Sequence, residues 1–155
     1  MFSVPLSKVE VLVHRQSIVH SMVEFCDNAV IAQMGVPDMK LPIVYAIHYP
    51  ERRFPVCEKL DLFKCNTLTF AKPDIDTFEC LGFAYDALKI GGTMPAVMNA
   101  ANEIAVSRFL NDEIEFLQIP YIIRKTMDAH TVKHNISITD VINADLWARE
   151  YGALI

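Results

Sequence analysis

Apolar and polar positions near the N-terminus alternate at the period of a β-strand. Between Ser17 and Phe25, one side of the predicted strand carries Val19, Val23 and Phe25, and the other carries Ile18, His20, Met22 and Glu24. A polar break at Asp27–Asn28 precedes a second extended run, Val30–Met34. The pattern therefore predicts a β-hairpin over Ser17–Met34, and the apolar run Val9–Val13 predicts a further strand before it.

One helix is predicted after the hairpin. Pro37 suits the first turn of a helix whose apolar pattern continues to about Tyr49, just before Pro50. Pro42 lies near the start of this helix, where a missing N–H costs least. Arg52–Pro73 has no regular period, so we expect an irregular connection there with one short apolar element.

From Asp76 onward the apolar positions recur at helical spacing, which predicts four helices in a small antiparallel bundle. Asp76 or Thr77 is the expected cap of the first helix, and Thr93 is the expected cap of the second. Gly91–Gly92 separates these two helices. The third covers about Leu117–Asp128, and the fourth begins near Thr139–Asp140. The expected apolar stripes are Leu81, Ala84, Tyr85 and Leu88, then Val97, Ala101, Ile104, Ala105 and Leu110, then Ile142, Leu146 and Trp147.

The fold class expected from these elements is α+β: a hairpin at a sheet edge with a covering helix, followed by a four-helix bundle. The expected division is residues 1–58 for the α/β part, 59–75 for the connection and 76–155 for the bundle. Two or three strands under one helix make a marginal sheet. We therefore expect either that the chain dimerises through this sheet or that it is a fragment of a longer protein.

Composition narrows the function classes. With 52% hydrophobic residues the chain has ample material for a core, and its net charge of -5 argues against a nucleic-acid partner. The four cysteines are widely spaced without a C-x-x-C pair, which is typical of reduced thiols rather than a zinc site or a disulfide framework. No signal sequence and no apolar run long enough to span a bilayer is apparent, so we expect a cytoplasmic protein that does not enter a membrane.

No catalytic motif is apparent in the sequence. A lone histidine such as His20 or His14 in a strand is more often structural than functional, although His20 could donate to an anionic or carbonyl substrate. His130 and His134 have helical spacing but lie in a polar stretch, which argues against a metal pair. Asn99, Asn102 and Glu103 favour helix–helix hydrogen bonding over a ligand site. Asp38 suits a helix N-terminus and Met39 a core.

Several motifs, in order and at matching spacing from about Val4 to Leu117, resemble the 1-deoxy-D-xylulose 5-phosphate reductoisomerase family. They are Val9–His14, Gln16–Val23, Val30–Gly35, Pro37–Met39 with Pro42–Ile43, Leu60–Leu62, Leu68–Phe70 with Pro73–Asp74, Gly91–Thr93 and Asn99–Glu103. One such motif is weak, whereas this ordered set is specific.

The resemblance implies an enzyme that makes 2-C-methyl-D-erythritol 4-phosphate in isoprenoid biosynthesis, by rearrangement and reduction with NADPH and a divalent Mg²⁺ or Mn²⁺ ion. In that family an N-terminal domain binds NADPH, and a central domain carries the metal carboxylates and forms the homodimer sheet. The resemblance places the start of this chain after the NADPH-binding domain and the metal carboxylates, so that its first half is the end of the central domain with the homodimer sheet. We therefore expect no catalytic, cofactor or metal residues in it and no cofactor bound by it alone. By the same resemblance, His20, Pro37 and Met39 are the substrate-proximal residues. His20 would orient the substrate or form a hydrogen bond to it.

Three readings remain open at this stage. The first is the C-terminal portion of the reductoisomerase, inactive without the N-terminal NADPH-binding and catalytic portion. The second is a stand-alone oligomerisation or interaction module derived from that enzyme. The third is a small independent enzyme built around His20.

Overall fold

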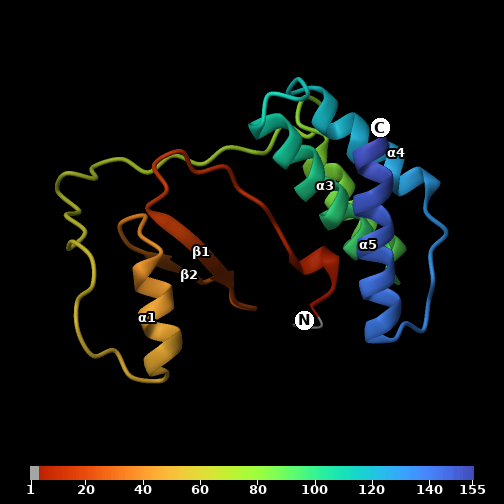
Figure 1. Cartoon of the computed structure of the whole chain (residues 1–155). Coiled ribbons are helices and arrows are strands. Elements are labelled where there is room, and N and C mark those ends of the chain that lie inside the picture. The colour runs from red at the N-terminus through yellow and green to blue at the C-terminus, as the bar shows by residue number, and fades with distance from the viewer. Residues whose placement is uncertain (1–3) are drawn as a thin grey trace. The chain divides into compact units, whose positions relative to one another are not determined.

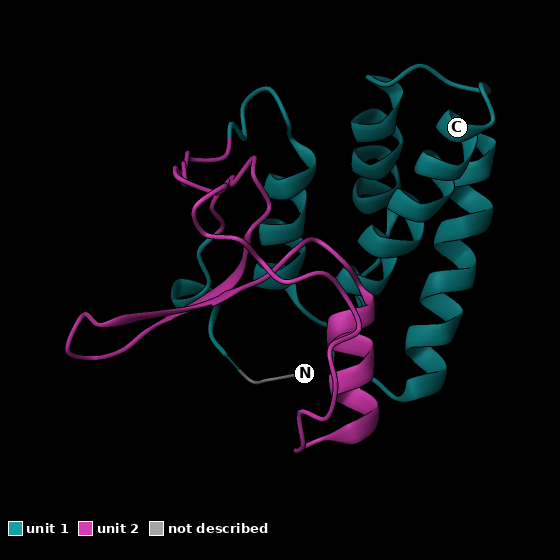
Figure 2. Cartoon of the chain, turned by 90° about the vertical axis from the view of Figure 1, so that its left-hand side faces the viewer, with its two compact units in different colours: residues 1–10, 74–155 teal, residues 11–73 magenta. Residues whose placement is uncertain are grey.

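The computed structural model describes residues 4–155, and the contacts divide the chain into two compact units (Figures 1 and 2). The hairpin unit is Val11–Pro73. The helical unit joins the residues up to Glu10 to Asp74–Ile155. The sequence-based division had placed the first residues with the hairpin. Residues 4–10 group instead with the helices, because a short 3₁₀ turn, η1 (Leu6–Lys8), contacts α2 (Cys80–Ile90), the first helix of the bundle.

The hairpin is confirmed. Strands β1 (Val19–Glu24) and β2 (Val30–Met34) pair antiparallel. At the connecting turn Asn28 has a φ of 66°, and the Asp27 carboxylate accepts a hydrogen bond from the Ala29 amide at 3.0 Å. Short polar side chains of this kind tolerate left-handed backbone and satisfy the amides of a tight turn, which is why the polar break became the hairpin's tip.

The strand predicted over Val9–Val13 is wrong. Only Val13 pairs, in an isolated antiparallel bridge to Ala71. The helix after the hairpin is confirmed as α1 (Lys40–His48), but it begins three residues after Pro37, so the prediction of Pro37 in its first turn is wrong. The helix contains no buried residue. Among the described residues, α1 and both strands therefore bury no side chain completely and keep large apolar side chains exposed.

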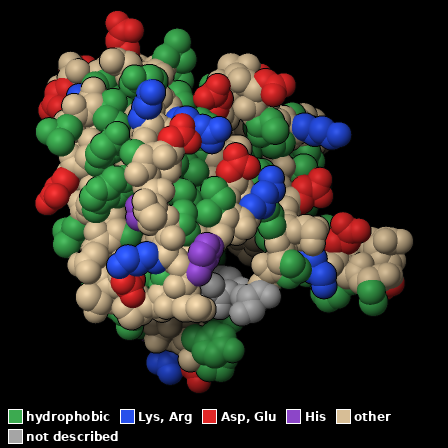
Figure 3. All heavy atoms as spheres, turned by 90° about the vertical axis from the view of Figure 1, so that its right-hand side faces the viewer, with side chains coloured by type: hydrophobic (Ala, Val, Ile, Leu, Met, Phe, Trp, Pro, Cys, Tyr) green, Lys and Arg blue, Asp and Glu red, His purple; other side chains and the backbone are tan. Residues whose placement is uncertain are grey.

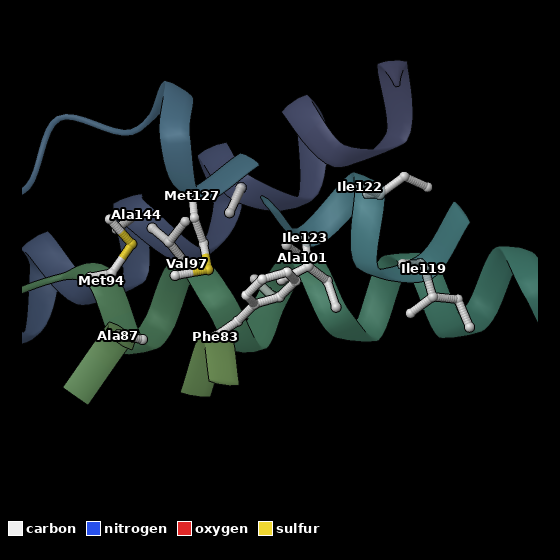
Figure 4. Packing of buried hydrophobic residues seen from close by; sticks show 13 residues of the cluster. Phe83, Ala87, Met94, Val97, Ala101, Ile119, Ile122, Ile123, Met127 and Ala144 are labelled. Carbon is white, nitrogen blue, oxygen red and sulfur yellow. The ribbon is translucent and has the colours of Figure 1, made fainter. Parts of the chain in front are cut away.

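The helical unit contains the core of the chain. It consists of α2 (Cys80–Ile90), α3 (Met94–Leu110), α4 (Gln118–Ala129) and α5 (Ile138–Leu154), as the four-helix prediction required. Helix α3 packs against the other three helices. Figure 4 shows apolar side chains of α2, α3 and α4, including Phe83, Val97 and Ile123, pointing toward one another.

Small residues decide which face of α5 is buried. Ala144, Ala148 and Gly152 recur every four residues on the buried face, whereas Ile142 and Leu146 are each 53% exposed. The predicted stripe of α5 is therefore wrong for those two residues. Helices approach closely where side chains are small, and Ala101 and Ala105 of α3 are also fully buried. Leu88 and Leu110 were likewise predicted to lie in the core and are exposed.

The helix ends follow local chemistry. Gly91 ends α2 with a φ of 71°, as predicted for a glycine after a helix. Helix α5 begins with a capping box, in which the Ser137 hydroxyl accepts the Asp140 amide at 3.2 Å and the Asp140 carboxylate accepts the Ser137 amide at 3.0 Å. The Ser137 hydroxyl also donates to the Asp140 carboxylate at 2.6 Å, and this hydrogen bond, followed by those from the Ser137 amide and from Lys133, lowers the pKa of Asp140 to about 2.

On the face drawn in Figure 3, acidic and basic side chains are interspersed among apolar ones. None of the helices within residues 4–155 combines the length and apolar character that crossing a bilayer requires.

Enlarging a small residue at the α3–α5 contact should destabilise the helical unit. Ala148 is fully buried, so Ala148→Leu must displace neighbouring side chains or backbone, at a cost of about 1–3 kcal/mol in the free energy of unfolding. Ala153→Leu adds the same side chain on the exposed side of the same helix and serves as the control. Urea unfolding followed by the fluorescence of the single tryptophan, Trp147, measures both. Equal midpoints for the two variants would contradict the packing.

Candidate functional site

His20 lies at an irregularity in the hairpin. Val19 pairs with Met34 and Ser21 pairs with Gln33, so β1 contains one extra residue at this point. Such a β-bulge breaks the alternation of faces: Val19 and Met22 share a face, although strict alternation had predicted opposite faces. Bulges often re-aim a side chain beside a functional site.

Gly35 joins β2 to the segment that carries the other two candidate residues. It is the single buried residue of the hairpin unit. A Cβ built on Gly35 would lie 3.8 Å from His20 Nε2 and 3.7 Å from Leu41 Cδ1. The imidazole of His20 therefore lies against the backbone just two residues before Pro37.

Pro37 and Met39 are both exposed, and Met39 is 71% exposed. Between them Asp38 accepts a hydrogen bond from the Lys40 amide at 2.9 Å, which supports the predicted role of Asp38 at the helix N-terminus. The prediction that Met39 packs in a core is wrong, because nothing in the described chain covers its side chain. The structure thus places His20 at the bulge beside Gly35, and presents an exposed proline and methionine on the segment that follows.

Two segments more than fifty residues apart close the hairpin unit, and we refer to this contact as the clamp. The members of the clamp are Val13, His14 and Gln16 on the first segment and Thr69, Phe70 and Ala71 on the second. Sequence patterns gave no sign of it, because its contacts are neither periodic nor local.

The clamp combines backbone and side-chain contacts. Val13 and Ala71 exchange two backbone hydrogen bonds of 2.9 Å. The Gln16 carboxamide donates to the Thr69 hydroxyl at 2.9 Å and accepts from it at 3.1 Å. His14 Nδ1 donates to the Thr69 carbonyl at 2.8 Å, and the ring of His14 stacks on Phe70 with centroids 4.7 Å apart. His14 is thus a structural histidine, in line with the expectation from its residue type alone.

A hollow of about 560 Å³ lies between α1 and the irregular segment that follows it. Its lining includes Gly35, Tyr45 and Arg52, whose guanidinium carbon lies 4.2 Å from the centre of the Tyr45 ring. His20, Pro37 and Met39 do not line it, but Gly35, against which the His20 imidazole lies, does, so the hollow adjoins the candidate site.

The polar cluster on α3 forms a link to α5. Asn99 donates to Glu103 at 2.9 Å, and Arg149 of α5 donates to Glu103 at 2.6 Å and to Asp145 at 2.7 Å. The hydrogen bond from Arg149, followed by that from Asn99, lowers the pKa of Glu103. The interpretation as helix–helix hydrogen bonding is confirmed for Glu103, whereas the hydrogen bond of Asn99 stays within α3. The sequence did not identify Arg149 as the partner of Glu103.

His130 links the loop between α2 and α3 to the loop between α4 and α5. Its Nε2 lies 2.7 Å from the Thr93 hydroxyl, which accepts the Lys133 amide at 3.1 Å, and its ring centroid lies 5.0 Å from that of Trp147. Because Thr93 already accepts from Lys133, its hydroxyl hydrogen is available to the Nε2 lone pair of a neutral imidazole. The prediction that Thr93 caps α3 with its side chain is wrong, since the hydroxyl is engaged here instead. A side chain at Gly92 would collide with the Lys133 carbonyl, so this contact requires glycine there.

Within residues 4–155, no three side chains of His, Cys, Asp or Glu converge into a set that could hold a metal ion. His130 is occupied by Thr93 and His134 is exposed.

Comparison with known proteins identifies related chains. A family model described as the DXP reductoisomerase C-terminal domain matches residues 34–151. A 1-deoxy-D-xylulose 5-phosphate reductoisomerase of Acetivibrio thermocellus is 55% identical over 150 residues, covering 97% of this chain and 39% of that protein. The same enzyme of Clostridium perfringens is 52% identical, again over 97% of this chain and 39% of the relative. The chain thus spans about two fifths of the length of these relatives.

Solved structures are similar as well. The reductoisomerase of Zymomonas mobilis in complex with NADPH matches with a TM-score of 0.90 and 45% identity, covering 99% of this chain and 40% of that one. A DOX-P reductoisomerase in complex with NADPH, fosmidomycin and magnesium matches with a TM-score of 0.84 and 34% identity, covering 92% of this chain and 37% of that one.

The contact between Thr93 and His130 should make the stability of the helical unit sensitive to acid. Burial lowers the pKa of His130 from its ordinary value of 6.5. Well above pH 6.5 the imidazole is neutral in both the folded and the unfolded chain. As the pH falls below that value, the unfolded chain takes up a proton that the folded chain resists, so the free energy of unfolding decreases.

Thermal unfolding at pH 7.5 and pH 5.0 measures this effect. The wild-type chain should lose more thermal stability between the two values than His130→Gln, whose side chain does not titrate. His134→Gln removes an exposed histidine four residues away and should behave like the wild type. A pH dependence in His130→Gln as steep as in the wild type would refute the assignment.

Proposed function

The chain belongs to the 1-deoxy-D-xylulose 5-phosphate reductoisomerase family, and from this premise we propose that it acts as the C-terminal portion of such an enzyme. The activity proposed for the whole enzyme is the rearrangement and NADPH-dependent reduction of 1-deoxy-D-xylulose 5-phosphate to 2-C-methyl-D-erythritol 4-phosphate, in the cytoplasm. The support is 55% identity to a relative of that name over 97% of this chain. The reading as a stand-alone module is not favoured, because the curated relatives described above carry the enzyme's name.

In this proposal, residues other than those of this chain bind the metal ion and the cofactor of the reaction. Related structures contain NADPH and magnesium. The donor side chains of residues 4–155 do not fit a divalent ion by themselves, because no three of them converge. We propose that the metal ligands and the NADPH site lie in the part of the relatives that this chain, which covers 39% of the Acetivibrio thermocellus protein, does not match.

The part of this chain in the reaction is to form one wall of the substrate pocket. His20 lies at the bulge with its Nε2 beside Gly35, where its ring can hydrogen-bond to an oxygen of the substrate and so orient it. Pro37 and the exposed Met39 supply apolar surface on the adjoining segment, which excludes water from one side of the substrate.

The hairpin is the proposed homodimer contact. No residue of either strand is buried, and within the described residues each strand has its hairpin partner as its one neighbour in the sheet. Unpaired edges with apolar side chains such as Ile31 and Val23 are sites where another strand adds. We propose that a second copy and the remainder of the enzyme cover these surfaces.

The observation that carries the proposal is the match of both units to an enzyme of known reaction, and a chimera tests it directly. The corresponding C-terminal region of the Acetivibrio thermocellus relative is replaced by this chain. The chimera should oxidise NADPH in the presence of 1-deoxy-D-xylulose 5-phosphate and Mg²⁺. A folded chimera without activity, next to an active parent enzyme, would refute the proposal.

Within the active chimera, His20→Gln should lower kcat/KM about tenfold, the effect of losing one hydrogen bond to a substrate group in a water-excluded site. His134→Gln, an exposed histidine of the helical unit, should leave kcat/KM unchanged. Unchanged kinetics in His20→Gln would remove His20 from the substrate pocket while leaving the family activity in place.

The chain by itself should associate through the hairpin. Light scattering of the purified chain should give the mass of a dimer, and Ile31→Lys should shift it toward the monomer, because the charge faces an apolar contact. Leu110→Lys changes a residue on α3 that is 73% exposed and should leave the mass unchanged. A wild-type monomer at high concentration would count against this surface.

A further inference from the structure

The hairpin that carries His20 has little to hold it in place. Its two strands contain no buried residue, and a two-stranded hairpin is marginally stable by itself. Something outside the strands must therefore fix their direction if His20 is to lie at a defined position.

The clamp lies at the point where β1 begins. Gln16, whose side chain holds Thr69, is four residues before His20. Between them the backbone turns sharply, since Ser17 has a φ of 53° and its amide donates to the His14 carbonyl at 3.2 Å. Ile18 then accepts the Gly35 amide at 3.0 Å, which starts the pairing with β2.

The geometry points to Gln16 and Thr69 as positioning residues. We propose that the hydrogen bonds between their side chains fix the base of the hairpin, and thereby the position of the His20 imidazole beside Gly35. This inference rests on the proposed function, in that His20 is taken as the residue facing the substrate. The inference gives a structural role to His14 of the Val9–His14 motif and to Gln16 of the Gln16–Val23 motif. These two residues are not themselves part of the candidate site.

Several contacts act together in this arrangement. The Gln16 carboxamide faces the Thr69 hydroxyl as both donor and acceptor, so neither group can turn without losing a hydrogen bond. His14 holds the Thr69 carbonyl from the same segment, at 2.8 Å. The bridge between Val13 and Ala71 pairs the backbones of the two segments, next to the side-chain contacts of Thr69. The two side-chain pairs therefore secure Thr69 from both its hydroxyl and its carbonyl.

The test uses the full chain with isotope-labelled histidine. Thr69→Val removes the hydroxyl and keeps the shape, whereas Thr69→Ser keeps the hydroxyl. Hydrogen exchange of the Val13 and Ala71 amides reports on the clamp, and the imidazole NMR signal of His20, assigned with His20→Gln, reports on positioning. In Thr69→Val both amides should exchange roughly fivefold faster, the effect of losing one to two exposed hydrogen bonds, and the His20 signal should shift.

Rescue and controls separate positioning from general destabilisation. Thr69→Ser should restore both readouts, and Thr67→Val, an exposed threonine two residues away, should change neither. Amides of α3 should be unaffected in all three variants. If Thr69→Val does not fold, Gln16→Met removes the same contacts from the other side and should give the same two changes.

Faster exchange with an unmoved His20 signal would overturn the proposal, since the clamp would then be structural only. Unchanged exchange in Thr69→Val would also overturn it. Neither readout needs substrate, so the result is independent of the chimera assay. A shifted His20 signal together with unchanged kinetics in His20→Gln would uphold the positioning and refute the substrate contact.

Discussion

The contact between residues 13–16 and 69–71 holds together a part of the chain that has almost no core. Closing a loop of more than fifty residues costs conformational entropy, and burial in the hairpin unit, where Gly35 is the single buried residue, offsets little of it. Backbone bonds at Val13 and Ala71, side-chain bonds at Gln16 and Thr69, and the ring stack of His14 on Phe70 supply directional contacts instead. In the proposed arrangement, this contact fixes the positions of the bulge at His20 and of the segment from Gly35 to Met39.

The helical unit is stabilised in a different way. Its four helices bury thirteen hydrophobic residues, and α3 is central because its alanines let neighbouring helices approach closely. Polar side chains serve here as connectors between elements: Arg149 ties α5 to Glu103 of α3, and Thr93 ties the start of α3 to His130. This unit has a core of its own, which the hairpin unit lacks.

The exposed apolar surface of the hairpin unit is consistent with a chain that corresponds to about two fifths of its relatives. Val23, Ile31 and Met39 are more than half exposed, although residues of these types are usually buried. In the proposed enzyme a second copy and the remainder of the enzyme cover the first two, and the third lies beside the substrate. The same partial coverage of the relatives accounts for residues that indicate no reaction and ordered motifs that indicate a family.

The sequence by itself determined the elements and the family. Strand alternation with Asp27–Asn28 predicted the hairpin, and helical spacing with Gly91 predicted the helices, because these signals depend on neighbouring residues alone. Tertiary structure decided which faces are buried. Both sides of α5 are non-polar enough to pack, and close approach to α3 selected Ala144 and Ala148 over Ile142. It also decided the bulge at His20, the hydroxyl contact of Thr93 and the clamp at Gln16, because each depends on a partner that is far away in the chain or on the register between two strands.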